Sequence, residues 1–229
     1  MTTPLRIGLA GLGTVGAGVA KILANQADVI GKRAGRPVVV TAVCARSKNK
    51  DRGVDLSAFE WFDDPVALAT SDAIDVFVEL VGGSEGPAND AVTAALKAGK
   101  HVVTANKALV ALHGARLAPL AEDAKVALNY EAAVAGGIPV IKAIREGLAG
   151  NEISRVSGIL NGTCNYILTE MEATGRAFGD VLADAQKLGY AEADPSFDVG
   201  GIDAAHKLAI LASLAFGVTL DFDGLYVEG

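Results

Sequence analysis

Short apolar runs and longer amphipathic stretches alternate along residues 1–130. Runs of β-branched and aliphatic residues are typical of buried strands, and apolar residues recurring with helical spacing indicate amphipathic helices. The alternation predicts successive β-α-β units, and therefore an α/β fold with a doubly wound parallel sheet that binds ligands at the carboxyl ends of its strands. The predicted strands are Leu5–Ala10, Val38–Cys44, Ile74–Leu80, His101–Thr104 and Val126–Tyr130, and the predicted helices are Thr14–Gln26, Pro65–Thr70, Pro87–Lys97 and Leu109–Ala124.

The pattern changes after Tyr130. Glycine and proline interrupt the chain at Gly136–Pro139, and a predicted strand, Ile153–Leu160, is followed by helical patterns. We therefore expect two domains, a doubly wound domain over residues 1–130 and an α+β domain over residues 131–229. The other elements predicted for the second domain are a helix up to Gly147, the helices Cys164–Thr174, Phe178–Leu188 and Asp203–Phe216, and an acidic loop at Glu192–Asp198.

Length and composition agree with this division. A domain typically has about 150 residues, so 229 residues correspond to about one and a half domains. The chain is 51% hydrophobic but only 5% aromatic, which predicts a core of small aliphatic side chains suited to parallel strands buried on both faces. The net charge of −7, with no dense cluster of lysine or arginine, disfavours nucleic acid as a partner.

Other features bear on the compartment. The longest uncharged apolar run, Leu208–Leu220, is shorter than the roughly 20 residues that span a bilayer, so we expect no membrane helix. The N-terminus enters a strand pattern directly, without the features of an export signal. Cys44 and Cys164 form neither a C-x-x-C motif nor a disulfide framework. These observations predict a protein of the reducing cytoplasm without a membrane partner.

The segment Gly11-Leu12-Gly13-Thr14-Val15-Gly16 follows the first predicted strand and opens the first predicted helix. In this context G-x-G-x-x-G is the phosphate-binding loop of Rossmann-type dinucleotide-binding domains. Its glycines permit a tight turn, close approach of a pyrophosphate and close helix–strand packing, while the helix N-terminus supplies N–H groups. The alternative is a glycine-rich turn without a ligand. We predict that the cofactor is bound by Gly11, Gly13, Thr14, Val15 and Gly16.

The end of the second predicted strand bears on the choice between NAD and NADP. An Asp or Glu there would bind the ribose 2′-hydroxyl of NAD, but this chain has Ala45–Lys50, which contains Arg46. A guanidinium suits a 2′-phosphate, so NADP is favoured and NAD stays possible. The alternative is a solvated basic turn. Because Ala27–Pro37 delays the second strand, the role of Arg46 depends on where that strand ends.

A second glycine-rich segment, Gly82-Gly83-Ser84-Glu85-Gly86, matches the G-x-S-x-G nucleophile elbow of α/β-hydrolases. Asp203 and His206 follow in the order that a catalytic triad requires. We disfavour a hydrolase because a proline lengthens the loop, where an elbow needs its helix to begin at once. Asp203 and His206 also stand on one predicted helix, too close together for a triad. We predict instead that Gly82 and Gly83 bind the cofactor near its nicotinamide.

Four carboxylates lie within twelve residues around the start of the last predicted helix: Glu192, Asp194, Asp198 and Asp203, followed by Lys207. Asp203 and Lys207, at i and i+4, share one helix face. Such a site can hold a substrate ammonium with its carboxylates while the lysine protonates a carbonyl oxygen. The alternative is an exposed ion pair, worth a few tenths of a kcal/mol. The apolar stretch after Lys207 favours a cleft over an exposed face.

Five segments in order resemble the homoserine dehydrogenases of the aspartate pathway, over essentially the whole chain. They are Gly11–Gly16, Thr104–Lys107, Tyr130–Pro139, Asn161–Leu168 and Gly189–Pro195, the last continuing to Asp198, Asp203 and Lys207. The resemblance implies reversible NAD(P)-linked reduction of L-aspartate 4-semialdehyde to L-homoserine, in threonine, methionine and isoleucine synthesis. It also implies a homodimer in which residues 131–229 bind substrate and mediate dimerisation. Family members usually continue further, so this domain is expected to be incomplete at its C-terminus.

The resemblance also implies roles for matching residues. Lys207 corresponds to the proton donor to the aldehyde oxygen, and Lys107 and Asp203 are further catalytic residues. The implied substrate-binding residues are Glu192, Asp198, Asp203, Thr163 and Tyr190. Thr104, Lys107 and Gly189 are implied as cofactor-binding residues in addition to those of the glycine-rich segments. A monovalent cation, usually sodium, is implied at Glu131 and the carbonyls of Val134, Gly136 and Ile138, where a plain domain hinge is the alternative.

Two other functions stay open at this point. One is a different Rossmann dehydrogenase or reductase of aspartate-derived substrates, which a comparison of carbonyl acids as substrates would distinguish. The other is an NADP-binding fragment without turnover, which would bind the cofactor and convert no substrate.

Overall fold

The computed structural model describes residues 2–229 and divides the chain into two compact units, Met1–Val140 and Ile141–Gly229, which are described separately. The sequence places the boundary earlier, after Tyr130, so the two divisions differ in the assignment of residues 131–140.

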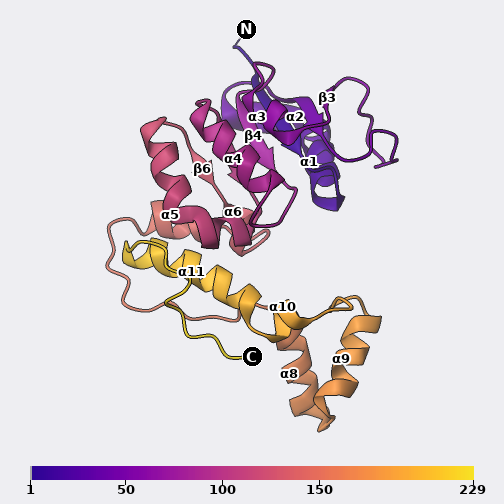
Figure 1. Ribbon diagram of the computed structural model, residues 1–229, viewed down its shortest axis with the longest axis vertical. Coiled ribbons are helices and arrows are strands. Elements are labelled where there is room, and N and C mark those ends of the chain that lie inside the picture. The colour runs from indigo at the N-terminus through magenta and orange to yellow at the C-terminus, as the bar shows by residue number, and fades with distance from the viewer. Residues whose placement is uncertain (1) are drawn as a thin grey trace. The chain divides into compact units, whose positions relative to one another are not determined.

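The first unit contains a six-stranded sheet in the order β3-β2-β1-β4-β5-β6, with every neighbouring pair parallel. Figure 1 labels β3, β4 and β6 of this sheet among the helices of the unit. The order reverses between β1 and β4, which is the switch point of a doubly wound fold. The predicted doubly wound parallel sheet is therefore confirmed. The strands are β1 Leu5–Ala10, β2 Val38–Cys44, β3 Glu60–Phe62, β4 Val76–Glu79, β5 His101–Thr104 and β6 Leu128–Asn129.

Helices cover both faces of this sheet. Apolar residues of α3, α4 and α5 pack with Phe77 and Val102 in one buried cluster, and residues of α1 pack with Leu9 and Val43 in another. Side chains of a strand alternate between its two faces, so one strand contributes to both clusters. The helices are α1 Thr14–Asn25, α2 Ala27–Ala34, α3 Pro65–Thr70, α4 Pro87–Lys97 and α5 Lys107–Asp123.

Local signals explain several of these boundaries. Asp64 accepts hydrogen bonds from the N–H groups of Val66 and Ala67 and so caps α3. Asn106 caps α5, which therefore begins at Lys107 rather than at the predicted Leu109. The sequence did not predict α2, which occupies most of the stretch that delays β2, nor β3, which is too short to leave a periodic pattern.

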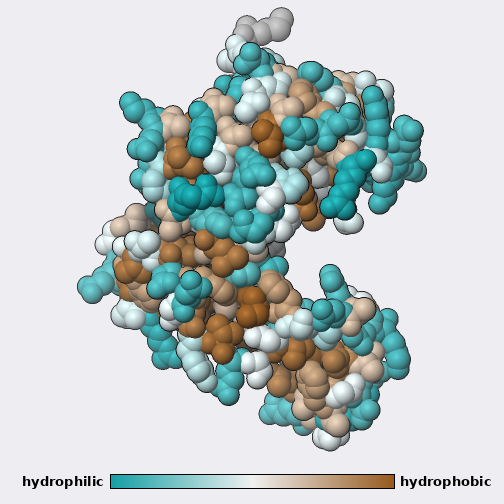
Figure 2. All heavy atoms as spheres, in the orientation of Figure 1, coloured by the Kyte–Doolittle hydropathy of each residue, from teal (hydrophilic) through white to brown (hydrophobic). Residues whose placement is uncertain are grey.

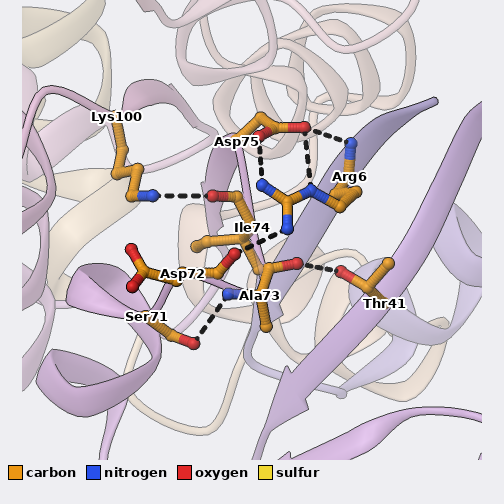
Figure 3. Close-up of polar contacts among 8 residues, drawn as sticks. All are labelled: Arg6, Thr41, Ser71, Asp72, Ala73, Ile74, Asp75 and Lys100. Carbon is orange, nitrogen blue, oxygen red and sulfur yellow. Dashed lines mark hydrogen bonds and ion pairs between the residues drawn. The ribbon is translucent and has the colours of Figure 1, made fainter. Parts of the chain in front are cut away.

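At the amino ends of the strands, charged side chains hold the turn between α3 and β4 (Figure 3). The Arg6 guanidinium on β1 donates to both carboxylate oxygens of Asp75, at 3.2 Å and 2.6 Å, and to the carbonyl of Asp72 at 2.6 Å. Lys100 Nζ donates to the carbonyl of Ile74 at 2.8 Å. These contacts fix how the chain enters β4, whose opposite end belongs to the candidate site.

Residues 141–229 are helical and contain no strand in the structure. The predicted strand Ile153–Leu160 is wrong, because a strand needs a hydrogen-bonding neighbour and this unit offers none. A capping Asn161 begins α8, and Gly175 and Gly217, both left-handed, end α8 and α11. Helix α7, Val140–Lys142, begins at the boundary, and the unit continues with a π-helical turn at Ala143–Gly147, α8 Gly162–Thr174, α9 Phe178–Lys187, α10 Ser196–Val199 and α11 Ile202–Phe216.

The second unit has a small core and much exposed apolar surface. Ile167, Val181 and Ala185 of α8 and α9 are buried together. By contrast, Ile159 and Leu168 have 77% and 64% of their surface exposed. On the face shown in Figure 2, hydrophobic side chains gather over α8 and α11. Among residues 2–229, no helix is long and apolar enough to cross a membrane.

Candidate functional site

The glycine-rich loop between β1 and α1 is built as its motif predicts. Gly11 has φ 98°, and a Cβ there would lie 2.3 Å from the carbonyl oxygen of Leu80. A Cβ on Gly16 would lie 1.9 Å from the carbonyl oxygen of Gly11. A Cβ on Gly13 would have no neighbour within 4 Å. Two of the glycines are thus required by packing, while Gly13 leaves open space in front of the helix N-terminus, where a pyrophosphate fits.

This loop borders a cavity of about 620 Å³ at the carboxyl edge of the sheet. The volume is in the range of pockets that hold small ligands and cofactors. Its lining includes Gly11 and Gly13 of the glycine-rich loop, Arg46 and Lys50 of the segment after β2, and Val81 of the loop after β4. The cavity lies beside β1 and β4, where the strand order reverses, which is where doubly wound proteins bind dinucleotides. The residues present therefore fit such a cofactor.

The basic segment after β2 is held by an arginine that the sequence did not single out. The strand ends at Cys44, and Arg46, two residues further on, is exposed and lines the cavity. Arg52 donates to three carbonyl oxygens: Leu12 at 3.0 Å, Lys50 at 2.7 Å and Ser47 at 2.6 Å. Arg52 thereby ties the basic segment to the glycine-rich loop. In the sequence it is one of several basic residues on a turn, and no local signal distinguishes it.

Glu79, at the end of β4, is fully buried and joins two loops at the same edge. Its Oε1 accepts hydrogen bonds from the N–H groups of Val81 and Gly82, at 2.8 Å and 2.9 Å. Its Oε2 accepts a hydrogen bond from the Thr104 hydroxyl at 2.5 Å. Of the residues predicted for the cofactor, Gly82 and Thr104 are thus brought together by Glu79. An acidic residue ending an apolar strand was the available signal for it.

The loop after β4 does not form a nucleophile elbow. Helix α4 begins only at Pro87, so Ser84 lies on an extended loop and not at a strand-to-helix turn. Asp203 and His206 both lie on α11. The sequence-based argument against a hydrolase is consistent with this geometry.

In the second unit, Lys207 and Asp203 form an ion pair on α11, with 2.7 Å between Nζ and Oδ2. Lys207 Nζ also donates to the carbonyl of Leu160 at 2.7 Å. The predicted placement of both side chains on one helix face is confirmed. Asp203 is buried and the Lys207 side chain is only 18% exposed, so this is not a solvated surface pair.

Asn161 joins the two aspartates of the predicted acidic group. Its side-chain nitrogen donates to Asp198 Oδ1 at 2.8 Å and to Asp203 Oδ2 at 2.9 Å. Its side-chain oxygen accepts from the N–H of Cys164 at 2.7 Å and caps α8. The sequence analysis placed Asn161 in a motif without giving it a role. We call Asn161, Asp198, Asp203 and Lys207 the Lys207 cluster.

Other residues predicted for the substrate lie nearby in the chain but outside this hydrogen-bonded network. Thr163 donates to the carbonyl of Tyr190 at 2.7 Å, so these two are brought together. Tyr190 is 56% exposed, and its ring packs edge-on against Tyr166. Gly189, with φ 77°, lies beside Tyr190, and Glu192 is exposed.

The remaining predicted residues belong to the first unit. Lys107 is half-buried at the first position of α5. Glu131 begins a short helix, α6 Glu131–Val134, and Gly137, with φ 80°, turns the chain after it. The N–H of Ile138 donates to the carbonyl of Ala135 at 3.2 Å. Within residues 2–229, no group of three or more His, Cys, Asp or Glu side chains is arranged to hold a metal ion.

Cys44 at the cavity is not a reactive nucleophile. Burial, with Asp64 and Asp63 adding to it, raises the pKa of this thiol to about 11. A thiol reacts as the thiolate, so Cys44 stays neutral and inert at neutral pH. Cys44 is therefore not a candidate nucleophile of the cavity.

A doubly wound sheet with a glycine-rich loop and a cavity at its switch point defines a dinucleotide-binding protein of the Rossmann class. Comparisons with known proteins identify the family. The family model of the homoserine dehydrogenase NAD-binding domain matches residues 11–131, and the family model named homoserine dehydrogenase matches residues 139–229. The chain belongs to the homoserine dehydrogenase family.

Relatives and solved structures agree with this assignment. The homoserine dehydrogenase of Neisseria gonorrhoeae is 52% identical over 226 residues, which are 99% of this chain and 52% of that protein. The crystal structure of a homoserine dehydrogenase from Thiobacillus denitrificans has a TM-score of 0.93 and 49% identity, over 99% of this chain and 52% of the other. A hyperthermophilic archaeal homoserine dehydrogenase in complex with NADPH has a TM-score of 0.82 and 28% identity, over 95% of this chain and 71% of the other. The chain spans about half the length of the curated relatives it matches.

Proposed function

We propose that this chain acts as an NAD(P)-dependent homoserine dehydrogenase, which reversibly reduces L-aspartate 4-semialdehyde to L-homoserine in threonine, methionine and isoleucine synthesis. The observation that carries the proposal is the presence, in one chain, of a dinucleotide cavity and a buried lysine–carboxylate cluster. These are the two parts that a hydride-transfer enzyme for an amino-acid aldehyde requires.

The cavity supports NADP as the preferred cofactor, with NAD as a possible second. Arg46 and Lys50 line it where the adenosine ribose of a dinucleotide lies, and a guanidinium binds a 2′-phosphate well. The archaeal family member described above binds NADPH. When bound, the nicotinamide supplies or accepts the hydride. Gly11, Gly13, Thr14, Val15, Gly16, Gly82, Gly83, Thr104, Lys107 and Gly189 are the other proposed cofactor contacts.

The Lys207 cluster supports the proton-transfer part of the reaction. The Lys207 ammonium is directed by its bonds to Asp203 and to the Leu160 carbonyl, so its position is fixed before substrate binds. In the proposed reduction it gives a proton to the aldehyde oxygen as hydride reaches the carbon. In this proposal Asp203 orients the lysine, and Asp198 attracts the substrate ammonium. Lys107, Glu192, Thr163 and Tyr190 are proposed to complete the substrate site.

The cation and the oligomer belong to the same proposal. Glu131 and Val134 begin and end α6, and Gly136 and Ile138 follow within four residues of its end; one carboxylate among carbonyl oxygens suits a hard monovalent ion such as sodium. The exposed apolar side chains of the second unit support a homodimer, because large apolar patches mark interfaces. The free thiols Cys44 and Cys164 suit a reducing cytoplasm.

The proposal is tested by following NADPH oxidation with aspartate semialdehyde and with other carbonyl acids. We expect turnover with the semialdehyde, and Lys207→Ala should lower kcat by a factor of about 100 or more without changing the Kd of NADPH. Lys187→Ala, which removes an exposed lysine of the same unit, should leave both values unchanged. Near-normal turnover by Lys207→Ala would refute its role as proton donor. NADPH binding without turnover of any substrate would favour a non-catalytic fragment, and a preference for another carbonyl acid would favour a different dehydrogenase.

A further inference from the structure

Glu79 is a buried acidic residue at the end of β4, where an apolar side chain would be expected to stabilise the sheet at least as well. Its side chain has no exposed surface, and its donors are the N–H groups of Val81 and Gly82 and the hydroxyl of Thr104. All three donors are neutral. Removing a carboxyl group from water is costly unless hydrogen bonds offset it, and a well-packed apolar residue generally stabilises a core as well or better. An acid at this position therefore points to a role other than stability.

The hydrogen bonds of Glu79 connect the loops that follow two adjacent strands. Glu79 and Thr104 are register partners in the parallel pair of β4 and β5. The Thr104 oxygen also accepts from the N–H of Asn106 at 2.9 Å, and the Asn106 side chain donates to the carbonyl of Gly83 at 2.6 Å. The result is a closed ring that runs from β4 through Thr104 and Asn106 back to the loop after β4.

This ring fixes the backbone of a loop in which two consecutive residues have a positive φ, a conformation that glycine adopts most readily. Gly82 and Gly83 have φ 84° and 82°, in the left-handed region. Consecutive N–H groups in such a loop form an anion-binding concavity. Here the N–H groups of Val81 and Gly82 are satisfied by the carboxyl group of Glu79. The loop after β4 is therefore held as a fixed surface and does not serve as a phosphate site, a task left to the N-terminus of α1.

We propose that Glu79 is a positioning residue for the nicotinamide half of the dinucleotide, an inference that rests on the proposed NAD(P)-dependent function. In a doubly wound sheet each half of the strand order binds one mononucleotide. Arg46 follows β2 in the half that receives adenosine, so the loops after β4 and β5 receive the nicotinamide end. Glu79 acts through Val81–Gly83 and Thr104, and it is not itself in contact with the cofactor.

The test separates the two halves of the cofactor. Binding of NADPH and of 2′,5′-ADP, which contains only the adenosine half, is measured by equilibrium titration for the wild-type chain and the variants Glu79→Ala and Glu79→Gln. Glu79→Ala should lower the affinity for NADPH by about tenfold and change the affinity for 2′,5′-ADP by less than about twofold. Glu79→Gln keeps the Oε1 acceptor and can donate to Thr104, so its affinity for NADPH should fall by only about threefold. Glu122→Ala, an exposed residue of α5, is the matched control and should change neither.

Unchanged NADPH affinity in Glu79→Ala would overturn the inference, and so would an equal loss of both ligands, which is the sign of a general structural defect. If Glu79→Ala does not fold, Glu79→Gln decides: a loss confined to NADPH supports the role, and no loss refutes it. The titrations contain no substrate. A chain that binds NADPH and 2′,5′-ADP but does not reduce aspartate semialdehyde would contradict the proposed activity alone, and the cofactor role of Glu79 would still be measured.

Discussion

The two edges of the sheet in the first unit both use a carboxyl group to hold a turn, but in opposite surroundings. At the amino edge, Asp75 is bonded to the Arg6 guanidinium, and both side chains remain about one-third exposed (Figure 3). At the carboxyl edge, Glu79 is buried and bonded to neutral donors. The glycine-rich loop and the cavity are at the same edge as Glu79.

The two edges differ in how much their carboxyl groups cost in stability. A solvated ion pair fixes a turn at little desolvation cost and contributes modestly to stability. A buried carboxyl group without a cation costs more to place, and here the N–H groups of the loop after β4 and the hydroxyl of Thr104 on β5 offset that cost with hydrogen bonds. The carboxyl edge thus gives up some stability for a defined backbone geometry, as binding sites commonly do. Changes at the amino edge should accordingly affect stability alone, whereas changes at the carboxyl edge should also lower ligand affinity.

The largest expected effect is at the carboxyl edge, in the glycine-rich loop. Gly16→Ala would place a Cβ 1.9 Å from the carbonyl oxygen of Gly11, so the loop must shift. We expect a loss of about 1–3 kcal/mol in the free energy of unfolding and a loss of NADPH affinity by a factor of about 100, measured by thermal unfolding and titration. Gly18→Ala in the same helix, where a Cβ meets nothing within 4 Å, is the control and should bind normally. Normal binding by Gly16→Ala would show that the loop does not hold the phosphates.

A smaller effect should distinguish the two ends of a single strand. Arg46 follows β2 and Arg36 precedes it, and both are exposed arginines. Arg46→Asp should weaken NADPH by about 10- to 100-fold, because charged hydrogen bonds to the 2′-phosphate are lost, and should leave NADH unchanged or better bound. Arg36→Asp should change the affinity for neither NADPH nor NADH. Competition titrations with both nucleotides give the ratio of the NADPH and NADH affinities. An unchanged ratio in Arg46→Asp would refute the 2′-phosphate assignment.

The smallest effect is expected at the amino edge. The hydrogen bond from Arg6 is the main cause that lowers the pKa of Asp75. A lowered pKa contributes stability that is present above the unfolded value of about 4 and is lost as the pH falls through the folded value. Asp75→Asn should therefore lower Tm at pH 7, with the difference from wild type shrinking in acid, while NADPH affinity stays unchanged. A pH-independent Tm difference, or a loss of affinity, would contradict the separation of the two edges.

The sequence alone determined the features that depend on local spacing. Strands β1, β2 and β5 and helices α3 and α4 have the predicted bounds because an apolar run or a capping residue leaves its signal within a few positions. The glycine-rich loop was predictable because its glycines follow a strand and open a helix. The pairing of Asp203 with Lys207 follows from the pitch of one helix.

Only the tertiary structure decided which distant residues meet. Asn161 joins Asp198 to Asp203, and Glu79 joins Gly82 to Thr104, through hydrogen bonds between segments that no local periodicity relates. The same reason explains the error at Ile153–Leu160, since the residues of one segment can suggest a strand but cannot supply the neighbouring strand that makes a sheet. Spacing along the chain decides local conformation, whereas the satisfaction of buried polar groups depends on how the whole fold brings donors and acceptors together.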